Sequence, residues 1–402
     1  AYPEELLIAM NLEDPRAYDV YRVNITDGKM RKVHQGDRTV TQWFADQQFR
    51  IRAAAAFRKD GSLEIRYRND ESEPWRTAYV WDPDAVAVSR PLSGLVKDQP
   101  VMYAVDANRS PVGRLGKIRL DTGEFEEVFG DPENEQYEML LHPETQEPQA
   151  VSVYKDKKKW HVLDPALAED FRKLEDALGG QFSVLARVEQ DRKWLLSAVS
   201  DVMPENFYMF DRDAGRVELL FESYPEAKTY PMAPMEPFSV RSRDGWTLHG
   251  YLVFPNGAGR EKLPMVVFPH GGPAWRNVWW FSPEVQGFAA LGYMCLLVNF
   301  RGSTGYGKDF ANAGNLEWGR KMNEDLLDAV QWTVERGYAD PEKIAIFGIS
   351  YGGYAALAAA VFTPDAFRCA VSVSGVSNLL GYLNSEPEYW EAYRPTILRA
   401  IG

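Results

Sequence analysis

The segment Lys343–Leu357, KIAIFGISYGGYAAL, decides the fold of this chain. Residues 343–347 form an apolar run typical of a buried parallel strand, and the residues that close the segment are small helix formers. Between them stands Gly348-Ile349-Ser350-Tyr351-Gly352, a G-x-S-x-G turn. Glycine is needed there because side chains would collide with the neighbouring strand and helix. The order strand, turn and helix therefore predicts that Ser350 stands clear of a sheet, where it can act as a nucleophile.

A second motif supports the first, because a bare G-x-S-x-G arises by chance in roughly one chain in ten of this length. His270-Gly271-Gly272-Pro273 lies 80 residues before Ser350 and directly after the strand-like PMVVFP. Such a loop offers backbone N–H groups to an oxyanion, and removing one donor costs about 100- to 1000-fold in rate. We expect the donors to be Tyr351 and Gly272, with Gly271 as the alternative to Gly272. Alternatively, HGGP is only a tight turn beneath a sheet.

Around these motifs the chain alternates strands with helices, which predicts a mostly parallel α/β sheet. The proline-rich PMAPMEPF, residues 231–238, reads as a linker that precedes this region. The expected strands are Thr247–Phe254, Pro264–Pro269, Tyr293–Asn299, Lys343–Phe347 and Ala370–Ser374. The expected helices are Pro283–Leu291, Asn323–Glu335 and Tyr351–Val361.

The first 230 residues have a different pattern, which predicts repeated β-hairpins. Three segments share the pattern strand, polar turn with glycine, strand: DVYRVNITDGKMRKV, RLGKIRLDTGEFEEV and NFYMFDRDAGRVELL. Their turn glycines, Gly28, Gly123 and Gly215, lie 95 and 92 residues apart, close to twice the period of a propeller blade. FRKDGSLEIRYR and VSVYKDKKKWHVLD add two hairpins, and one short helix is expected near Asp164–Leu178. We predict four or five β-propeller blades; the alternative is an irregular β-sandwich.

Three motifs together resemble the prolyl oligopeptidase family, most closely its acylaminoacyl-peptidase branch. They are HGGP, NFRGSTGYG (Asn299–Gly307) and GYADPEKIAIFGISYGGYAAL (Gly337–Leu357). The match is close over residues 230–402, whereas the earlier region agrees only in architecture. The resemblance implies a partial β-propeller, residues 1–230, followed by an incomplete α/β-hydrolase domain, residues 231–402, whose mostly parallel doubly wound sheet lacks its last strands.

The resemblance also implies a function. Members are serine peptidases that hydrolyse short peptides through an acyl-enzyme, here on Ser350, and need no metal or cofactor. The expected activity is that of an oligopeptidase or of an aminoacyl or acylaminoacyl peptidase, with the propeller excluding folded proteins. Two alternatives remain. A carboxylester hydrolase would use the same residues, and a propeller-based binding protein could carry an inactive hydrolase domain.

The expected triad is incomplete, because this fold orders its residues serine, acid, histidine. All five histidines precede Ser350: His34, His142, His161, His249 and His270. The acids after it, Asp365, Glu386, Glu388 and Glu391, read as a helix end and a solvated loop. We therefore expect the acid and base beyond Gly402, in a chain truncated there and also at its amino terminus. A triad serine without its histidine loses about a million-fold in turnover, so this piece alone is expected to be inactive and prone to aggregation.

Composition excludes several partners. The net charge of −13 disfavours nucleic acid, and no apolar run reaches the ~18 to 20 residues of a membrane span. We expect a soluble, cytoplasmic protein without a visible signal peptide, whose oligomeric state stays open. Cys295 and Cys369 lie in apolar runs that read as buried strands, which suits core thiols better than a disulfide. The basic run Lys155–Lys159 reads as a solvated hairpin turn.

Weaker signals each have a structural interpretation that we favour. Trp275, Trp279, Trp280 and Phe281 could line a substrate pocket, but packing against the propeller is twice as common. Arg301 could hold a substrate carboxylate, although a buried ion pair is more usual. Asp325 and Asp328, three residues apart, could suggest a metal pair, but a solvated helix face or a hydrogen bond to a loop is preferred.

Overall fold

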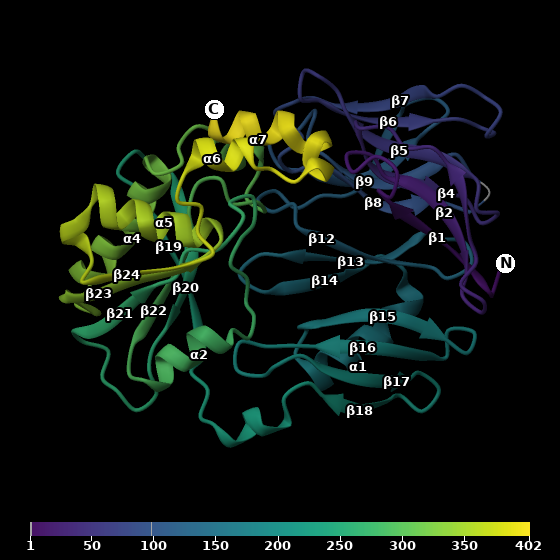
Figure 1. The fold of residues 1–402 in the computed structure, drawn as a ribbon. Coiled ribbons are helices and arrows are strands. Elements are labelled where there is room, and N and C mark those ends of the chain that lie inside the picture. Colours follow the sequence, from purple (N-terminus) through teal and green to yellow (C-terminus); the bar gives the residue numbers. More distant parts are fainter. Residues whose placement is uncertain (1, 98) are drawn as a thin grey trace. The chain divides into compact units, whose positions relative to one another are not determined.

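The computed structural model describes residues 2–97 and 99–402. Five antiparallel sheets of three or four strands follow one another along the chain, each an up-and-down meander of the kind that forms propeller blades (Figure 1). The strands are β1 (Glu5–Met10), β2 (Asp19–Asn24) and β3 (Met30–His34); β4 (Val40–Ala45), β5 (Ile51–Phe57), β6 (Leu63–Tyr67) and β7 (Arg76–Trp81); β8 (Arg90–Leu95), β9 (Val101–Asp106), β10 (Arg114–Arg119) and β11 (Phe125–Phe129); β12 (Tyr137–Leu141), β13 (Pro148–Tyr154) and β14 (Lys158–Val162); and β15 (Phe182–Val188), β16 (Lys193–Ala198), β17 (Asn206–Asp211) and β18 (Arg216–Glu222). The partial β-propeller is confirmed, with five blades.

All five predicted hairpins are present. The three segments with glycine turns form the antiparallel pairs β2–β3, β10–β11 and β17–β18, and the other two form β5–β6 and β13–β14. The turn glycines Gly28, Gly123 and Gly215 have φ angles of 71°, 77° and 61°. Only glycine adopts this left-handed region without a steric penalty, which explains why the turns were legible in the sequence.

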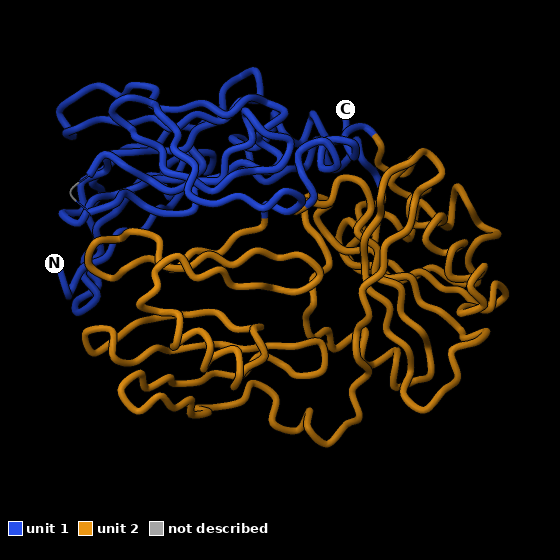
Figure 2. Tube along the Cα trace, turned by 180° about the vertical axis from the view of Figure 1, so that it is seen from behind, with its two compact units in different colours: residues 1–135, 306–316, 378–402 blue, residues 136–305, 317–377 orange. Residues whose placement is uncertain are grey.

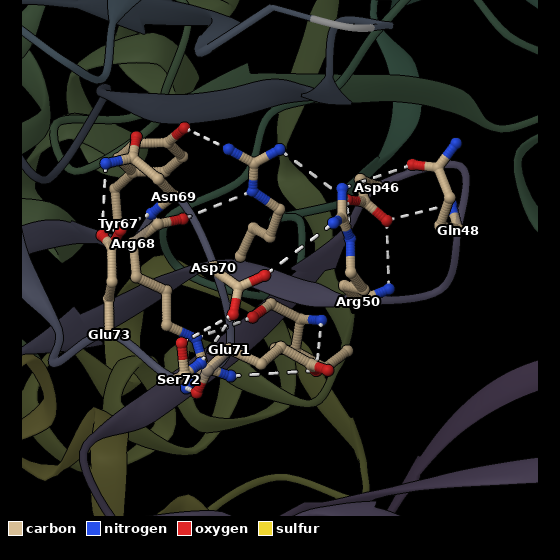
Figure 3. Close-up of polar contacts among 12 residues, drawn as sticks. Asp46, Gln48, Arg50, Tyr67, Arg68, Asn69, Asp70, Glu71, Ser72 and Glu73 are labelled. Carbon is tan, nitrogen blue, oxygen red and sulfur yellow. Dashed lines mark hydrogen bonds and ion pairs between the residues drawn. The ribbon is translucent and has the colours of Figure 1, made fainter.

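A polar network joins two turns of the second sheet (Figure 3). Arg68 donates from Nε to the carbonyl of Ile51 at 3.0 Å and from Nη1 to the carbonyl of Glu71 at 2.9 Å. The Glu71 carboxylate in turn accepts the N–H of Ile51 at 3.0 Å. Arg50 pairs with Asp46 at 2.7 Å. Burial lowers the pKa of Arg68 below its ordinary value. The arginines are thus held by groups of their own sheet, and the network ties the β4–β5 turn to the β6–β7 turn.

The sixth sheet is the predicted α/β sheet, in the order β19-β20-β22-β21-β23-β24. Its last four strands are parallel, whereas β19 and β20 are antiparallel additions. The strands are β19 (Met235–Arg241), β20 (Thr247–Val253), β21 (Leu263–Val267), β22 (Met294–Asn299), β23 (Ala339–Ile349) and β24 (Cys369–Val373). The α-helices are α1 (Ala168–Leu178) in the propeller region, then α2 (Pro283–Ala290), α3 (Lys308–Asn312), α4 (Lys321–Glu335), α5 (Tyr351–Phe362), α6 (Leu379–Asn384) and α7 (Arg394–Ile401). Short 3₁₀ turns are η1 (Pro165–Leu167), η2 (Pro225–Thr229), η3 (Pro364–Ala366) and η4 (Glu388–Tyr393).

The five strands and three helices predicted for this region are confirmed, but one strand and the helices α3, α6 and α7 were missed. The second half of the proline-rich segment is not a linker, because Met235–Arg241 forms β19 with Pro237 inside it. Proline cannot donate to a ladder and is therefore confined to edge positions. β19 is an edge strand that pairs only with β20, so one of its sides needs no donors.

The core of the α/β sheet consists of side chains from its central strands and the helices over them. Met265, Val267, Leu296 and Val298 are fully buried. Cys295 is buried as predicted, and burial raises its pKa to about 12. The prediction for Cys369 was wrong, because this thiol is exposed. It opens β24, an edge strand of the sheet, so only one side of the strand is paired.

The described residues divide into two compact units (Figure 2). One comprises residues 1–135, 306–316 and 378–402; the other comprises residues 136–305 and 317–377. The second unit thus contains the sheets β12–β14 and β15–β18 as well as the α/β sheet. This division does not test the predicted boundary at residues 230 and 231, which stays a prediction. None of the helices in residues 2–97 and 99–402 is long and apolar enough to cross a membrane.

Candidate active site

Ser350 lies on a strained turn between β23 and α5. Its φ and ψ are 58° and −121°, a conformation that non-glycine residues avoid and that the nucleophile of a G-x-S-x-G turn adopts. A Cβ on Gly348 would lie 2.2 Å from the backbone of Gly352, so the turn closes only with glycine there. The Ser350 N–H donates to the carbonyl of Val373 at 2.9 Å. The side chain is exposed at the start of the helix.

The segment from Phe268 to Asn277, here called the oxyanion loop, contacts this turn. A Cβ on Gly271 would lie 3.6 Å from the Cβ of Ser350, and one on Gly352 would lie 2.2 Å from the carbonyl oxygen of Pro269. The two motifs, 80 residues apart in the sequence, are therefore in direct contact. A Cβ on Gly272 would instead meet Trp275 at 3.1 Å.

Three backbone N–H groups of the two motifs have no acceptor within the described residues. They belong to Gly271, Gly272 and Tyr351. Tyr351 is the first residue of α5, and the positive end of a helix dipole favours negative charge there. The arrangement suits a developing oxyanion. The assignment of Tyr351 with Gly271 or Gly272 as donors stays a prediction.

His270 is locked in place beside this site. Its Nδ1 lies 2.7 Å from the carbonyl oxygen of Gly271, and its Nε2 lies 2.8 Å from Ser303 Oγ. The ring also stacks on Phe300, with 4.3 Å between ring centroids. Burial lowers the pKa of His270 to about 4, so the ring is neutral at pH 7. A carbonyl only accepts, which assigns the proton to Nδ1, and Nε2 then faces the Ser303 hydroxyl, which also lies 2.6 Å from the carbonyl oxygen of Phe300. Neither nitrogen is available as a base for Ser350.

The described part of the chain supplies no other partner for the nucleophile. Its hydrogen bonds include none between Ser350 Oγ and an imidazole or a carboxylate. Of the acids after Ser350, Asp365 is exposed and Glu386 pairs with Arg394 at 3.1 Å. Neither behaves as a triad acid in this chain.

Arg301 is structural, as favoured from the sequence. Its guanidinium is 2% exposed and reaches Asp325 at 2.6 Å and Asp244 at 2.7 Å. These carboxylates raise the pKa of Arg301 despite its burial, while Arg301 lowers the pKa of Asp244. Asp328 pairs separately with Arg243 at 2.7 Å. No group of three potential ligands that could hold a metal occurs among residues 2–97 and 99–402.

The tryptophans within and after the oxyanion loop have different surroundings. Trp279 is 7% exposed and packs with Tyr154 of β13 and Tyr251 of β20, which confirms packing against the propeller. Trp280 and Trp275 are exposed, and Trp280 borders a cavity of about 280 Å³ lined mainly by β12 to β16. The hydrogen bonds of Arg276 with the carbonyls of Tyr154 and Lys155 in the β13–β14 hairpin were missed from the sequence. No local signal marks them, since the partners lie more than 100 residues apart.

Comparison with known proteins agrees with these features. Residues 279–396 match the prolyl oligopeptidase family. The whole chain is 35% identical over 408 residues to dipeptidyl aminopeptidase BIII of Pseudoxanthomonas mexicana, of which it covers 59%. It is 31% identical over 430 residues to dipeptidyl peptidase family member 6 of Caenorhabditis elegans, of which it covers 58%. The human acylamino-acid-releasing enzyme matches 52% of the chain at 32% identity, with 30% of that enzyme covered.

A solved structure shares the fold. The puromycin-hydrolysing peptidase of Mycobacterium tuberculosis superimposes with a TM-score of 0.72 at 20% identity, over 99% of this chain and 63% of that one. The chain thus spans less than two thirds of the length of the relatives that it matches along its whole sequence. The motif order, the propeller sheets and the α/β sheet agree with the match of residues 279–396 to the prolyl oligopeptidase family and with the similarity of the chain to the two dipeptidyl peptidases.

Proposed function

We propose that the whole protein is a serine peptidase that hydrolyses short peptides through an acyl-enzyme on Ser350. The proximity of Gly271 to the strained Ser350 turn supports the proposal, because it brings the proposed nucleophile close to a loop whose N–H groups have no acceptor among the described residues. Ser350 Oγ would form a bond to the scissile carbonyl carbon, and the carbonyl oxygen would become an oxyanion. Collapse of this intermediate would break the C–N bond and release the amine with a proton, and water would then hydrolyse the ester.

The oxyanion is proposed to rest on the N–H of Tyr351 and that of Gly271 or Gly272. Gly271 is favoured because a Cβ added to it would lie 3.6 Å from the Ser350 Cβ, whereas a Cβ added to Gly272 would meet Trp275. Each donor is worth about 3 to 4 kcal/mol of transition-state stabilisation. We assign the general base to none of the five histidines, since His270 is engaged at both nitrogens and the fold places its triad histidine after the serine.

Within peptidases, we propose that the protein releases dipeptides from the amino terminus of its substrates. Support comes from the names of the two relatives matched along the whole chain, at 35% and 31% identity. An acylaminoacyl peptidase would instead require a blocked amino terminus. The two activities are separable, since release of dipeptides needs a free α-amino group on the substrate and an acylaminoacyl peptidase does not tolerate one.

The test uses the full-length protein. Wild type should react with a fluorophosphonate probe and the Ser350→Ala variant should not; labelling that survives the substitution would refute the nucleophile. Hydrolysis should then be compared for dipeptidyl, acylaminoacyl and blocked oligopeptide amides and for simple acyl esters of matched leaving group. Turnover of esters alone would replace the peptidase by an esterase. Labelling of a protein that turns over none of them would favour a binding role.

A further inference from the structure

The oxyanion loop is fastened to its own domain near both ends. His270 lies within hydrogen-bond distance of Ser303, and the N–H of Asn277 donates to Asn299 Oδ1 at 2.6 Å. Asn299 completes the second fastening by donating to the carbonyl of Asn277 at 3.1 Å. Between these points lie Gly271 and Gly272, the residues whose N–H groups the proposed function uses.

Arg276 fastens the loop to a different element, the turn between β13 and β14. Its guanidinium donates from Nη2 to the carbonyl of Lys155 at 2.8 Å and from Nη1 to that of Tyr154 at 3.4 Å. The residue is only 3% exposed. Both the turn and the loop belong to the same compact unit (Figure 2). A buried guanidinium that donates to carbonyls of a distant hairpin fixes distance and direction, because its donors form a rigid fork.

Further contacts hold the same turn. Tyr251 of β20 donates its hydroxyl to the carbonyl of Asp156 at 2.6 Å, and Tyr154 donates to the carbonyl of Trp279 at 3.1 Å. Lys157 Nζ lies 3.7 Å from the centroid of the Trp279 ring, within range of a cation–π interaction. Burial raises the pKa of Tyr154 to about 12, so its hydroxyl stays a donor. The basic turn is therefore not simply solvated, as the sequence suggested, because its carbonyls receive side chains of the α/β domain.

The guanidinium is also enclosed from the other side. A Cβ on Gly305 would lie 2.7 Å from Arg276 Nη1 and 3.0 Å from its Cδ. Gly305 has a φ of 94°, so glycine is required there both for the backbone and for the arginine. Thr304, the residue before it, donates its N–H to the carbonyl of Trp275 at 2.9 Å. Arg276 is thus held between the hairpin turn and the Gly305 segment, with little freedom to move.

We propose that Arg276 is a positioning residue, which holds the oxyanion loop against the β13–β14 turn of the propeller so that the loop N–H groups face Ser350. The inference rests on the proposed function. Oxyanion donors act at 2.7 to 3.1 Å, and a misplacement of about 1 Å can cost about 100-fold in rate. Arg276 lies five residues after Gly271, so release of its side chain is transmitted through a short loop to the donors. The propeller then contributes to catalysis through its hairpin, in addition to any role in substrate access.

The experiment compares four full-length proteins: wild type, Arg276→Met, Arg276→Lys and the control Arg260→Met. Arg260 pairs with Glu236 on the surface of the same unit, so its loss removes an arginine without touching the loop. We expect Arg276→Met to lower kcat per titrated active site by about tenfold or more with KM within about twofold. Arg276→Lys should recover part of kcat, and Arg260→Met should match wild type. Values of kcat within twofold of wild type for Arg276→Met would overturn the proposal.

A second measurement separates positioning from simple stability. A peptide aldehyde, whose adduct with Ser350 carries an oxyanion, should bind the Arg276→Met variant more weakly by the same factor as kcat, while the matching peptide alcohol should bind equally well. A loss of kcat without a loss of aldehyde affinity would contradict the inference. If Arg276→Met does not fold, Arg276→Lys carries the same comparison, since it keeps the charge and the stem.

Hydrogen exchange keeps the inference testable if wild type hydrolyses no peptide amide, an outcome that would refute the proposed function alone. The amides of residues 271–277 should exchange faster in Arg276→Met than in wild type or Arg260→Met. Equal exchange rates in the three proteins would overturn the positioning role of Arg276.

Discussion

Replacing Gly352 by alanine should disable the site without removing any functional group. The added Cβ would lie 2.2 Å from the carbonyl oxygen of Pro269 and 3.4 Å from that of His270. A carbon and a carbonyl oxygen in contact lie about 3.3 Å apart, so the start of α5 and the oxyanion loop must separate by about 1 Å. Pro269 is two residues before Gly271, so the displacement reaches the proposed donors.

We expect kcat of the Gly352→Ala variant to fall by about 100-fold, equivalent to about 3 kcal/mol of transition-state stabilisation. The assay is hydrolysis of a dipeptidyl amide by the full-length protein, normalised by fluorophosphonate titration and accompanied by circular dichroism. Gly287→Ala is the matched control, because no atom lies within 4 Å of its added Cβ and the residue is exposed in α2. A folded Gly352→Ala variant with activity within threefold of Gly287→Ala would refute the reasoning.

Three further predictions concern buried groups. Asp325→Ala leaves the Arg301 guanidinium buried without its main partner, so it should lower the free energy of unfolding, measured in urea, by about 3 to 5 kcal/mol. Replacing the exposed Asp365 by alanine should change this free energy by less than about 0.5 kcal/mol. Similar urea midpoints for the two variants would contradict the structural role of the Arg301–Asp325 pair. The pKa of His270 is about 4 in the folded state and 6.5 in the unfolded state, so its contribution to stability is present above pH 6.5 and is lost as the pH falls. Between pH 7 and pH 5, the free energy of unfolding should therefore drop by about 2 kcal/mol more in wild type than in His270→Gln. Parallel pH profiles of the two proteins would count against this prediction. Cys295, whose pKa burial raises to about 12, should react with a thiol reagent only after denaturation, and rapid labelling of the native protein would show that the site is accessible.

Local patterns account for what was predicted well. The turn at Ser350 requires glycine at positions 348 and 352 because backbone atoms occupy the space of a side chain. The hairpin turns at Gly28, Gly123 and Gly215 require a positive φ. Each requirement arises within a few residues and excludes nearly all residues but glycine, so it is visible in the sequence. The period between the turns then follows from the size of a propeller blade.

The incorrect predictions arise from long-range structure and not from local patterns. Pro237 suggested a linker, yet it lies in an edge strand that can spare an N–H. Cys369 was expected to be buried because its strand is apolar, but the sheet leaves one side of that strand unpaired. In both cases the residue type was read correctly, and the outcome depended on which strands lie beside it. Neighbours in a sheet are chosen over distances that a local pattern does not encode.

The sequence by itself determined the strand, turn and helix around Ser350 and the presence of a second glycine-rich loop, since short-range sterics of the backbone dictate both. Only the tertiary structure decided that Gly271 lies beside Ser350, that His270 is held at both ring nitrogens, and that Arg276 reaches the carbonyls of the β13–β14 turn. These contacts join residues up to about 120 positions apart. A carbonyl is the same acceptor at every residue, so which one receives a buried guanidinium is decided by packing alone.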